Sequence, residues 1–189
     1  MTKVSATKSV ILNCGSYGAG GLIGLTRNVA VSISECQFEG EVSTTRRVGG
    51  ILGEHRANTT IRNCYVNATV ISTYTVEDNA QIGGIIGYGN NGDLTIEHSL
   101  VLGEVKAPAT YNLGHVVGYS NPEVKVTDVY YANTRINTTG GNINEPDVKY
   151  DPTGDVPTEK TILELKSGNV LFTQSDAWIY EKDKLPTLK

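Results

Sequence analysis

The hexapeptide VGGILG, at residues 48–53, places three glycines around two large apolar residues. Glycine weakens the interior of a strand and offers no side chain for packing. The same box nevertheless occurs four times along the chain. Its copies are AGGLIG (19–24), VGGILG (48–53), IGGIIG (82–87) and LGHVVG (113–118). Recurrence at this spacing predicts a repeat protein, in which one supersecondary unit stacks on the next.

Two further boxes follow each glycine box in a fixed order. The second boxes are ISEC (33–36), IRNC (61–64), IEHS (96–99) and VTDV (126–129). The third boxes are QFEGEV (37–42), YVNATV (65–70), LVLGEV (100–105) and YYANTR (130–135). Apolar residues alternate in these boxes without helical periodicity, which predicts short strands. A unit of 28 to 35 residues suits one coil of a β-solenoid better than a propeller blade, which needs about 40.

We therefore expect an all-β fold, a right-handed parallel β-helix (β-solenoid) of about four coils with a small C-terminal capping segment. Stacking would bring equivalent residues into columns about 4.8 Å apart. The expected interior columns are Leu22/Ile51/Ile85/Val116, Ile33/Ile61/Ile96/Val126, Cys36/Cys64/Ser99/Val129 and Phe38/Val66/Val101/Tyr131. The glycines would supply tight bends, through positive φ or close backbone approach.

The chain is predicted to form one structural domain in three parts. Residues 1–135 hold the solenoid repeats, opened by an abbreviated unit, ILNC (11–14); residues 136–155 form a polar loop; residues 156–189 form a C-terminal cap. In the last part Thr161 and Glu164 fit a capping box, which predicts a short helix before a Trp-containing strand. A solenoid end exposes core and strand edges, so we expect this segment to cover the last coil.

Composition narrows the classes of function. The 189 residues are 39% hydrophobic and 19% charged, which allows a packed core. A net charge of −4 argues against a dedicated nucleic-acid binder. The short clusters at 46–47 and 54–56 are expected to be solvated turns. Residues 1–10 lack the apolar segment of a signal peptide, and no apolar run approaches the roughly 18 residues of a membrane helix, so membrane insertion is not expected.

The GG-[LI]-[IVL]-G box followed by an N-C-Y-type box resembles the GLUG-motif repeat of bacterial surface proteins, over about residues 11–135. That family includes adhesin-like proteins and the non-catalytic repeats of some immunoglobulin A1-specific metallopeptidases. The resemblance implies a secreted or cell-surface location. The segment 158–189 is similar to one that often follows such repeats. The fourth copy departs from the pattern, because Gly114–His115 stands where the family has two glycines.

The three cysteines lie at equivalent places. Cys36 and Cys64 share a column, and Cys14 holds the matching position in the abbreviated unit. A metal or redox site is one interpretation. We favour buried thiols that pack as small apolar groups, because apolar residues occupy this column in other coils.

Other polar residues carry weaker signals. Glu41 and Glu104 share a column across Thr69, roughly 9–10 Å apart, a separation that suits an inverting glycosidase; solvated outer-face carboxylates are the interpretation we favour. His98, equivalent to Asn63, is expected at the surface. An acidic stretch offers calcium ligands at a spacing that matches no EF-hand; its residues are Glu145, Asp147, Asp151 and Asp155. We expect no cofactor and no metal.

Two features are candidates for binding. Tyr88 and Tyr119 follow the last glycine of consecutive boxes, so they should stack one coil apart, as a sugar platform or as a stabilising ladder. The segments after the third box vary in length, and insertions in solenoids collect on one face, often the binding face. The candidate residues in these segments are Arg46, Arg47, Tyr74, Glu77, Asp78, Tyr111 and Asn112. Tolerated surface loops are the alternative.

We therefore expect a non-catalytic structural or adhesive module, a spacer or a surface that contacts a host protein or glycan through the variable loops. No HExxH, GxSxG or phosphate-binding loop occurs in the sequence. The alternative is a carbohydrate-active or peptidase-associated β-helix with a weak outer-face site.

Overall fold

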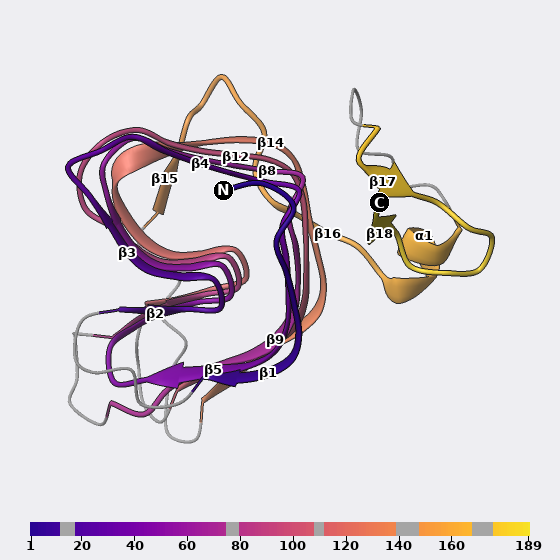
Figure 1. The fold of residues 1–189 in the computed structure, drawn as a ribbon, viewed down its shortest axis with the longest axis horizontal. Coiled ribbons are helices and arrows are strands. Elements are labelled where there is room, and N and C mark those ends of the chain that lie inside the picture. The colour runs from indigo at the N-terminus through magenta and orange to yellow at the C-terminus, as the bar shows by residue number, and fades with distance from the viewer. Residues whose placement is uncertain (12–17, 75–79, 108–111, 139–147, 168–175) are drawn as a thin grey trace.

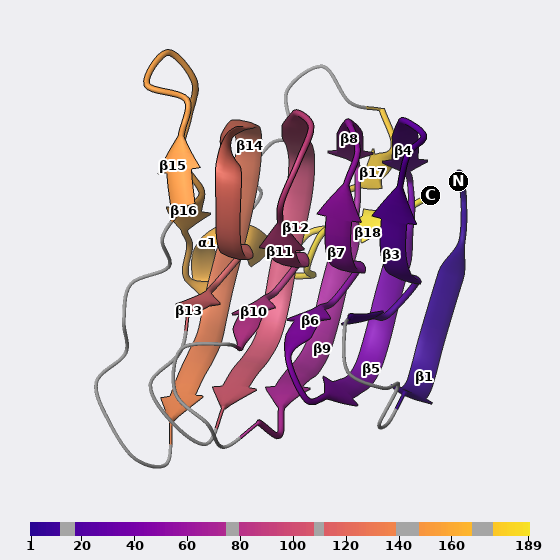
Figure 2. The ribbon, with the colours of Figure 1, turned by 90° about the vertical axis from the view of Figure 1, so that its left-hand side faces the viewer.

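The computed structural model describes residues 1–11, 18–74, 80–107, 112–138, 148–167 and 176–189. Within these residues the chain winds into a β-solenoid of about four turns with parallel strands, as the sequence predicts (Figure 1). Seen from the N-terminal end in Figure 1, the chain runs clockwise as it recedes, and Figure 2 shows the coils stacked in chain order. The solenoid is therefore right-handed.

The strands form four parallel ladders. The first ladder contains β2 (Ala19–Gly20), β6 (Arg47–Gly49), β10 (Gln81–Gly83) and β13 (Asn112–Gly114). The second contains β3 (Ile23–Arg27), β7 (Leu52–Arg56), β11 (Ile86–Gly89) and the start of β14 (Val117–Thr138). The third contains β4 (Val31–Ser34), β8 (Thr59–Arg62), the start of β12 (Leu94–Ala107) and the middle of β14. The fourth contains β1 (Ser5–Ile11), β5 (Gln37–Thr44), β9 (Tyr65–Ser72) and the later parts of β12 and β14.

The strand register confirms the predicted interior columns. Direct partners include Ile33/Ile61/Ile96/Val126 and Phe38/Val66/Val101/Tyr131. Nearly all of these side chains are buried in one apolar core that runs the length of the solenoid. Each side chain packs on its equivalent one coil away, which favours a uniform size within a column.

The glycine box forms a re-entrant turn, in which the chain folds back into the coil between the first and second ladders (Figure 1). A Cβ placed on Gly53 would lie 2.5 Å from the amide nitrogen of Ala19, and one on Gly50 would lie 2.5 Å from Cγ1 of Val66. The boxes therefore require glycine because of the close backbone approach. A positive φ angle is not the reason, because no glycine of the four boxes has one.

Left-handed backbone occurs instead at a second corner, at the third position of each second box. The residues there are Glu35, Asn63, His98 and Asp128, with φ values of 53°, 51°, 47° and 48°. Asparagine, aspartate and histidine are among the residues that tolerate this region best. The corner is thus a column of polar residues rather than of glycines.

His115 fills the place of the middle glycine in the fourth box. Its ring stacks on Tyr131, with centroids 4.2 Å apart and planes 15° apart. In the preceding coil the same two places hold Gly84 and Val101. The described residues pair no strand with the far side of β13, so this coil has room for two larger rings.

The ladders continue beyond the fourth coil. The strands β15 (Val148–Tyr150) and β16 (Thr158–Glu159) both pair with β14 in parallel. The solenoid thus extends past residue 135 into the stretch expected to be a polar loop. The helix α1 (Ile162–Lys166) follows and has the predicted capping box of Thr161 and Glu164. The last two strands, β17 (Trp178–Ile179) and β18 (Thr187–Leu188), are antiparallel.

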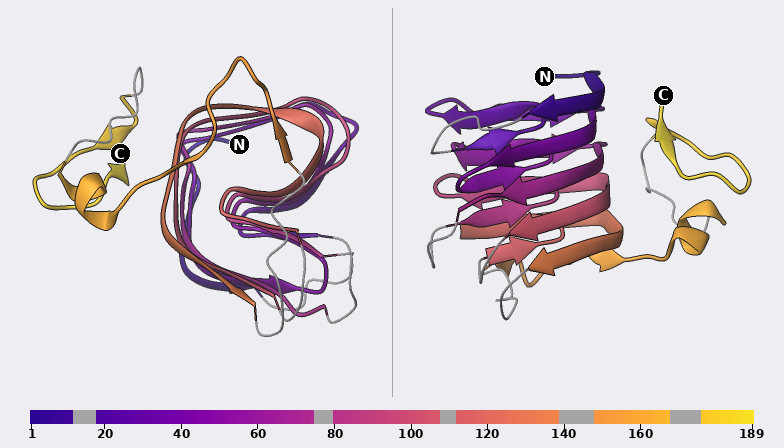
Figure 3. Two further views of the ribbon diagram at one scale, coloured as in Figure 1. Left: turned by 180° about the vertical axis from the view of Figure 1, so that it is seen from behind. Right: turned by 90° about the horizontal axis from the view of Figure 1, so that it is seen from below.

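The C-terminal segment packs against the side of the solenoid (Figure 3), not over its last coil as the sequence suggested. Trp178 and Leu165 are buried there, and Trp178 meets Tyr65 edge to face at 6.4 Å between centroids. Leu163, in the helix of this segment, is 77% exposed and covers no coil. The physical reason is that outward positions of the fourth ladder carry apolar side chains, namely Tyr65, Leu100, Leu102 and Ala132.

The close approach predicts that Gly53→Ala destabilises the protein by roughly 1–3 kcal/mol, because backbone atoms of Ala19 and Gly24 cannot give way. Gly24→Ala is the matched control. Among the described residues its Cβ would meet only the carbonyl group of Gly18, with the oxygen at 3.0 Å. Urea denaturation of both variants checks the difference, and equal midpoints would contradict the argument.

Candidate functional site

The re-entrant turn brings Arg47 of β6 and Glu54 of β7 together. Arg47 Nη1 donates a hydrogen bond of 2.6 Å to Glu54 Oε2, and Arg56 Nε donates one to Oε1. The Glu54 side chain is completely buried, whereas those of Arg47 and Arg56 keep 18% and 27% of their exposure. Glu54 can remain charged in this place because each of its oxygens is paired.

Arg47 also covers Tyr88, with its guanidinium carbon 4.0 Å from the ring centroid. Tyr88 stacks on Tyr119, with centroids 5.3 Å apart and planes 13° apart, so the predicted stacking of these rings is confirmed. Both faces of Tyr88 are therefore covered. Only the edge and hydroxyl of this ring are open to a ligand, which fits a stabilising ladder better than a face-on sugar platform.

The other predicted binding residues lie beside this stack or outside the described residues. Arg46 donates a hydrogen bond of 2.8 Å to the Tyr74 hydroxyl, with its guanidinium carbon 4.8 Å from that ring. Asn112 begins β13, in register with Gln81 and, one coil further, with Arg47. Glu77, Asp78 and Tyr111 fall outside the described residues.

The prediction that residues 54–56 form a solvated turn is wrong, since Glu54 and His55 are both completely buried. The signal lay in position: Glu54 follows the last glycine of its box, as Tyr88 and Tyr119 do. These residues belong to one outward column, and a second outward column lies two residues further along each strand. We call the two columns together the Arg/Tyr face; they are Leu25/Glu54/Tyr88/Tyr119 and Arg27/Arg56/Asn90/Asn121.

A chain of hydrogen bonds orients the amides of the Arg/Tyr face. The Tyr119 hydroxyl donates to Asn121 Oδ1 at 2.6 Å. Asn121 Nδ2 in turn donates to Asn90 Oδ1 at 3.2 Å, across two coils. Both amide oxygens are thus engaged, and the Asn90 nitrogen is left as a donor.

His55 faces the interior behind the Arg/Tyr face, in register with Thr26 and Gly89. Burial lowers the pKa of His55 below its ordinary value of 6.5. Its Nδ1 lies 3.2 Å from the carbonyl oxygen of Ala57, so Nδ1 carries a proton that it donates to this oxygen. His55 is a structural residue of the core.

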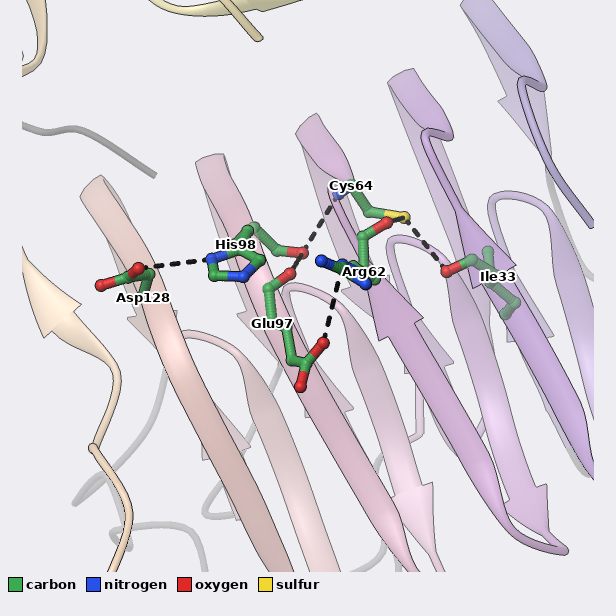
Figure 4. Close-up of polar contacts among 7 residues, drawn as sticks. Ile33, Arg62, Cys64, Glu97, His98 and Asp128 are labelled. Carbon is green, nitrogen blue, oxygen red and sulfur yellow. Dashed lines mark hydrogen bonds and ion pairs between the residues drawn. The ribbon is translucent and has the colours of Figure 1, made fainter. Parts of the chain in front are cut away.

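Figure 4 shows two residues of the polar corner column, His98 and Asp128, with their neighbours. His98 Nδ1 lies 3.3 Å from Asp128 Oδ2, and Arg62 pairs with Glu97 at 3.7 Å. The expectation of a surface position for His98 is wrong, because this residue is only 6% exposed. The left-handed corner directs its side chain along the column toward Asp128.

The cysteines occupy the predicted buried column beside this corner (Figure 4). Cys36 and Cys64 are free thiols with no exposure, and Cys14 lies outside the described residues. A hydrogen bond with Cys36, together with burial, raises the pKa of the Cys64 thiol. The backbone amide of Cys64 donates a hydrogen bond of 3.1 Å to Ser99 Oγ, so a hydroxyl group takes the place of the thiol in the next coil.

The predicted column of Glu41, Thr69 and Glu104 is present. Glu104 pairs with Lys106 at 2.8 Å. Glu104 also borders an open groove of about 560 Å³ on the outer face. The other residues lining this groove are Lys8, Glu39, Gly40, Asn67, Ala68, Thr69 and Gly103. The glycines and the alanine leave it shallow.

Among the described residues, no group of three His, Cys, Asp or Glu side chains converges in a geometry that could hold a metal ion. Of the four loop acids considered for calcium, Glu145 and Asp147 lie outside the described residues. Asp151 accepts hydrogen bonds from the side chain and amide of Thr153, which lower the pKa of its carboxyl group. No helix within the described ranges is long and apolar enough to cross a membrane.

Comparison with known proteins agrees with this architecture. Residues 44–71 match the GLUG motif, which confirms the resemblance seen in the repeats. A crystal structure from Bacteroides ovatus, described as that of a candidate immunoglobulin A1 protease, has the same fold, with a TM-score of 0.73 and 21% identity. The match covers 100% of this chain and 57% of that one. No curated protein matches the sequence.

Glu54→Gln should destabilise the fold by roughly 2–4 kcal/mol, since it leaves two partly enclosed guanidinium groups without their counter-charge. Glu97→Gln is the control, because it removes an exposed partner at 3.7 Å and should cost about 0–1 kcal/mol. Thermal unfolding of both variants distinguishes these values. A Glu54→Gln protein as stable as the control would refute the central place of this carboxylate.

Stability should fall as the pH drops below about 6.5. The pKa of His55 is lowered in the folded protein, so the unfolded chain takes up a proton first as the pH falls. Proton uptake lowers the free energy of the unfolded chain relative to that of the native state, and the free energy of unfolding decreases. Above that pH both states are neutral at this residue and its contribution is constant. Melting temperatures from pH 7.5 to 5 measure the slope, and His55→Asn should flatten it; an unchanged slope in this variant would contradict the argument.

Proposed function

We propose that this chain is a non-catalytic repeat module of a secreted or surface-exposed bacterial protein, serving as a rigid spacer with a lateral surface that binds a protein or glycan. The observation that carries the proposal is the register that is kept from coil to coil along most of each ladder. Equivalent residues pair directly, with a shift between Leu102 and Glu104, and the outward columns differ in chemistry from coil to coil. Each coil then contacts its neighbours alone, an arrangement suited to extension and display.

Two further findings support the proposal. The GLUG motif is a repeat unit, and the crystal structure that shares this fold belongs to a longer chain, of which the match covers 57%. A module of this kind would act beside other domains. The name of that longer protein suggests an extracellular setting.

An alternative is a weak carbohydrate- or peptide-cleaving site on the outer face. The observation in its favour is the groove that holds Glu39 and Glu104. Glu104 is already paired with Lys106 at 2.8 Å, which leaves it poorly placed as a general acid.

The test combines binding and turnover. Purified protein is applied to a glycan array and to immobilised immunoglobulin A1, and the same ligands are assayed for reducing ends, unsaturated products and peptide cleavage. The proposal predicts binding without turnover. Turnover that disappears in Glu104→Gln would establish the alternative. Antibody labelling of intact cells that express the full gene tests the location, and labelling only after lysis would contradict it.

A further inference from the structure

The Arg/Tyr face has an excess of positive charge on an acidic protein. It carries three guanidinium groups around it, from Arg27, Arg47 and Arg56, and the carboxylate of Glu54 is the only acid in its two columns. The whole chain has a net charge of −4. Figure 2 looks directly onto this face, across β3, β7, β11 and the start of β14.

Arg27 and Arg56 are direct partners on adjacent strands. Like charges at this spacing repel one another. Glu54 compensates Arg56, whereas Arg27 is exposed and has no ion pair with any described residue. An anion placed against the pair would relieve the repulsion and would gain charge-assisted hydrogen bonds.

The N–H groups of the outer column that have no partner within the protein's described residues can donate hydrogen bonds to a ligand. Arg56 uses its Nε on Glu54, which leaves its two Nη groups. The Asn90 oxygen accepts from Asn121, which leaves the Asn90 NH2 group as a donor in the column of Arg56, one coil further along the chain. From Arg27 to Asn90 the column therefore offers guanidinium and amide N–H groups about 4.8 Å apart, along the solenoid axis.

We infer that the Arg/Tyr face binds a carboxylate-bearing glycan, such as a uronate polymer, laid along the solenoid axis. The carboxylate sits on Arg27 and Arg56, and Asn90 donates to a neighbouring sugar oxygen. The open edges of Tyr88 and Tyr119 flank the chain. This inference rests on the proposed function and names its ligand.

The donor pattern favours a glycan over an acidic peptide. A peptide presents an N–H at nearly every residue, and the outer column offers those groups few acceptors because the amide oxygens are already engaged. The face is also the surface of a sheet rather than a free strand edge, so a peptide cannot bind here by adding a strand. Uronate residues present carboxylate, ring and glycosidic oxygens, which only accept, and hydroxyls, which can accept as well as donate.

The experiment measures binding of oligogalacturonate by isothermal titration calorimetry, beside its methyl ester and poly-glutamate. Arg27→Gln should weaken oligogalacturonate binding about fivefold to tenfold, with an unchanged melting temperature because the side chain is exposed. Asn90→Asp should abolish binding, because it replaces a donor by an anion that pairs with Arg56. Arg62→Gln, which removes the same charge at the distant corner, should bind like the original protein.

Three results would overturn the inference: equal affinity for the methyl ester, equal affinity for poly-glutamate, or an Arg27→Gln protein that binds normally. Binding to other glycans or to immunoglobulin A1, without binding of oligogalacturonate, would overturn the assignment of the ligand and leave the proposed function intact. Turnover of any ligand, or no binding to the array at all, would instead count against the proposed function.

Discussion

The fold depends on how closely two stretches of backbone can approach inside each coil. The re-entrant turn places its limbs in contact: a Cβ on Gly49 would lie 2.2 Å from the carbonyl oxygen of Leu52, and one on Gly53 would meet backbone atoms of Ala19 in the preceding coil. Backbone cannot move aside as a side chain can, so glycine is strongly favoured at these positions. The rest follows from this contact: the limbs shape the core, and their outward sides hold Arg47 against Glu54 and Tyr88.

The repeats made much of this predictable. Once the boxes were aligned, strand alternation and stacking were enough to give the interior columns and the pairing of Tyr88 with Tyr119, because both depend only on position within a repeat. The buried carboxylate of Glu54 was missed for the opposite reason. Its burial depends on Arg47 reaching across the turn, a contact between limbs that no periodicity encodes.

The C-terminal segment shows the same limit. A short helix and its capping box are local features and were predictable from Thr161 and Glu164. The place where that helix docks depends on which outward positions of distant coils are apolar, and Leu100 and Tyr65 gave no local sign of this. The corner at His98 was likewise misjudged, because strand alternation assumes a straight strand, whereas the backbone there turns through the left-handed region.

The side docking of the C-terminal segment also changes how the molecule should come apart. A solenoid whose coils touch only their neighbours can fray from either end, one coil at a time. Here Trp178 and Leu165 rest on residues from successive coils, Tyr65, Leu100 and Ala132 among them. The segment therefore acts as a brace that ties coils together from outside. Loss of the terminal coil disturbs the brace and, through it, the coils beneath, so unfolding becomes a cooperative event.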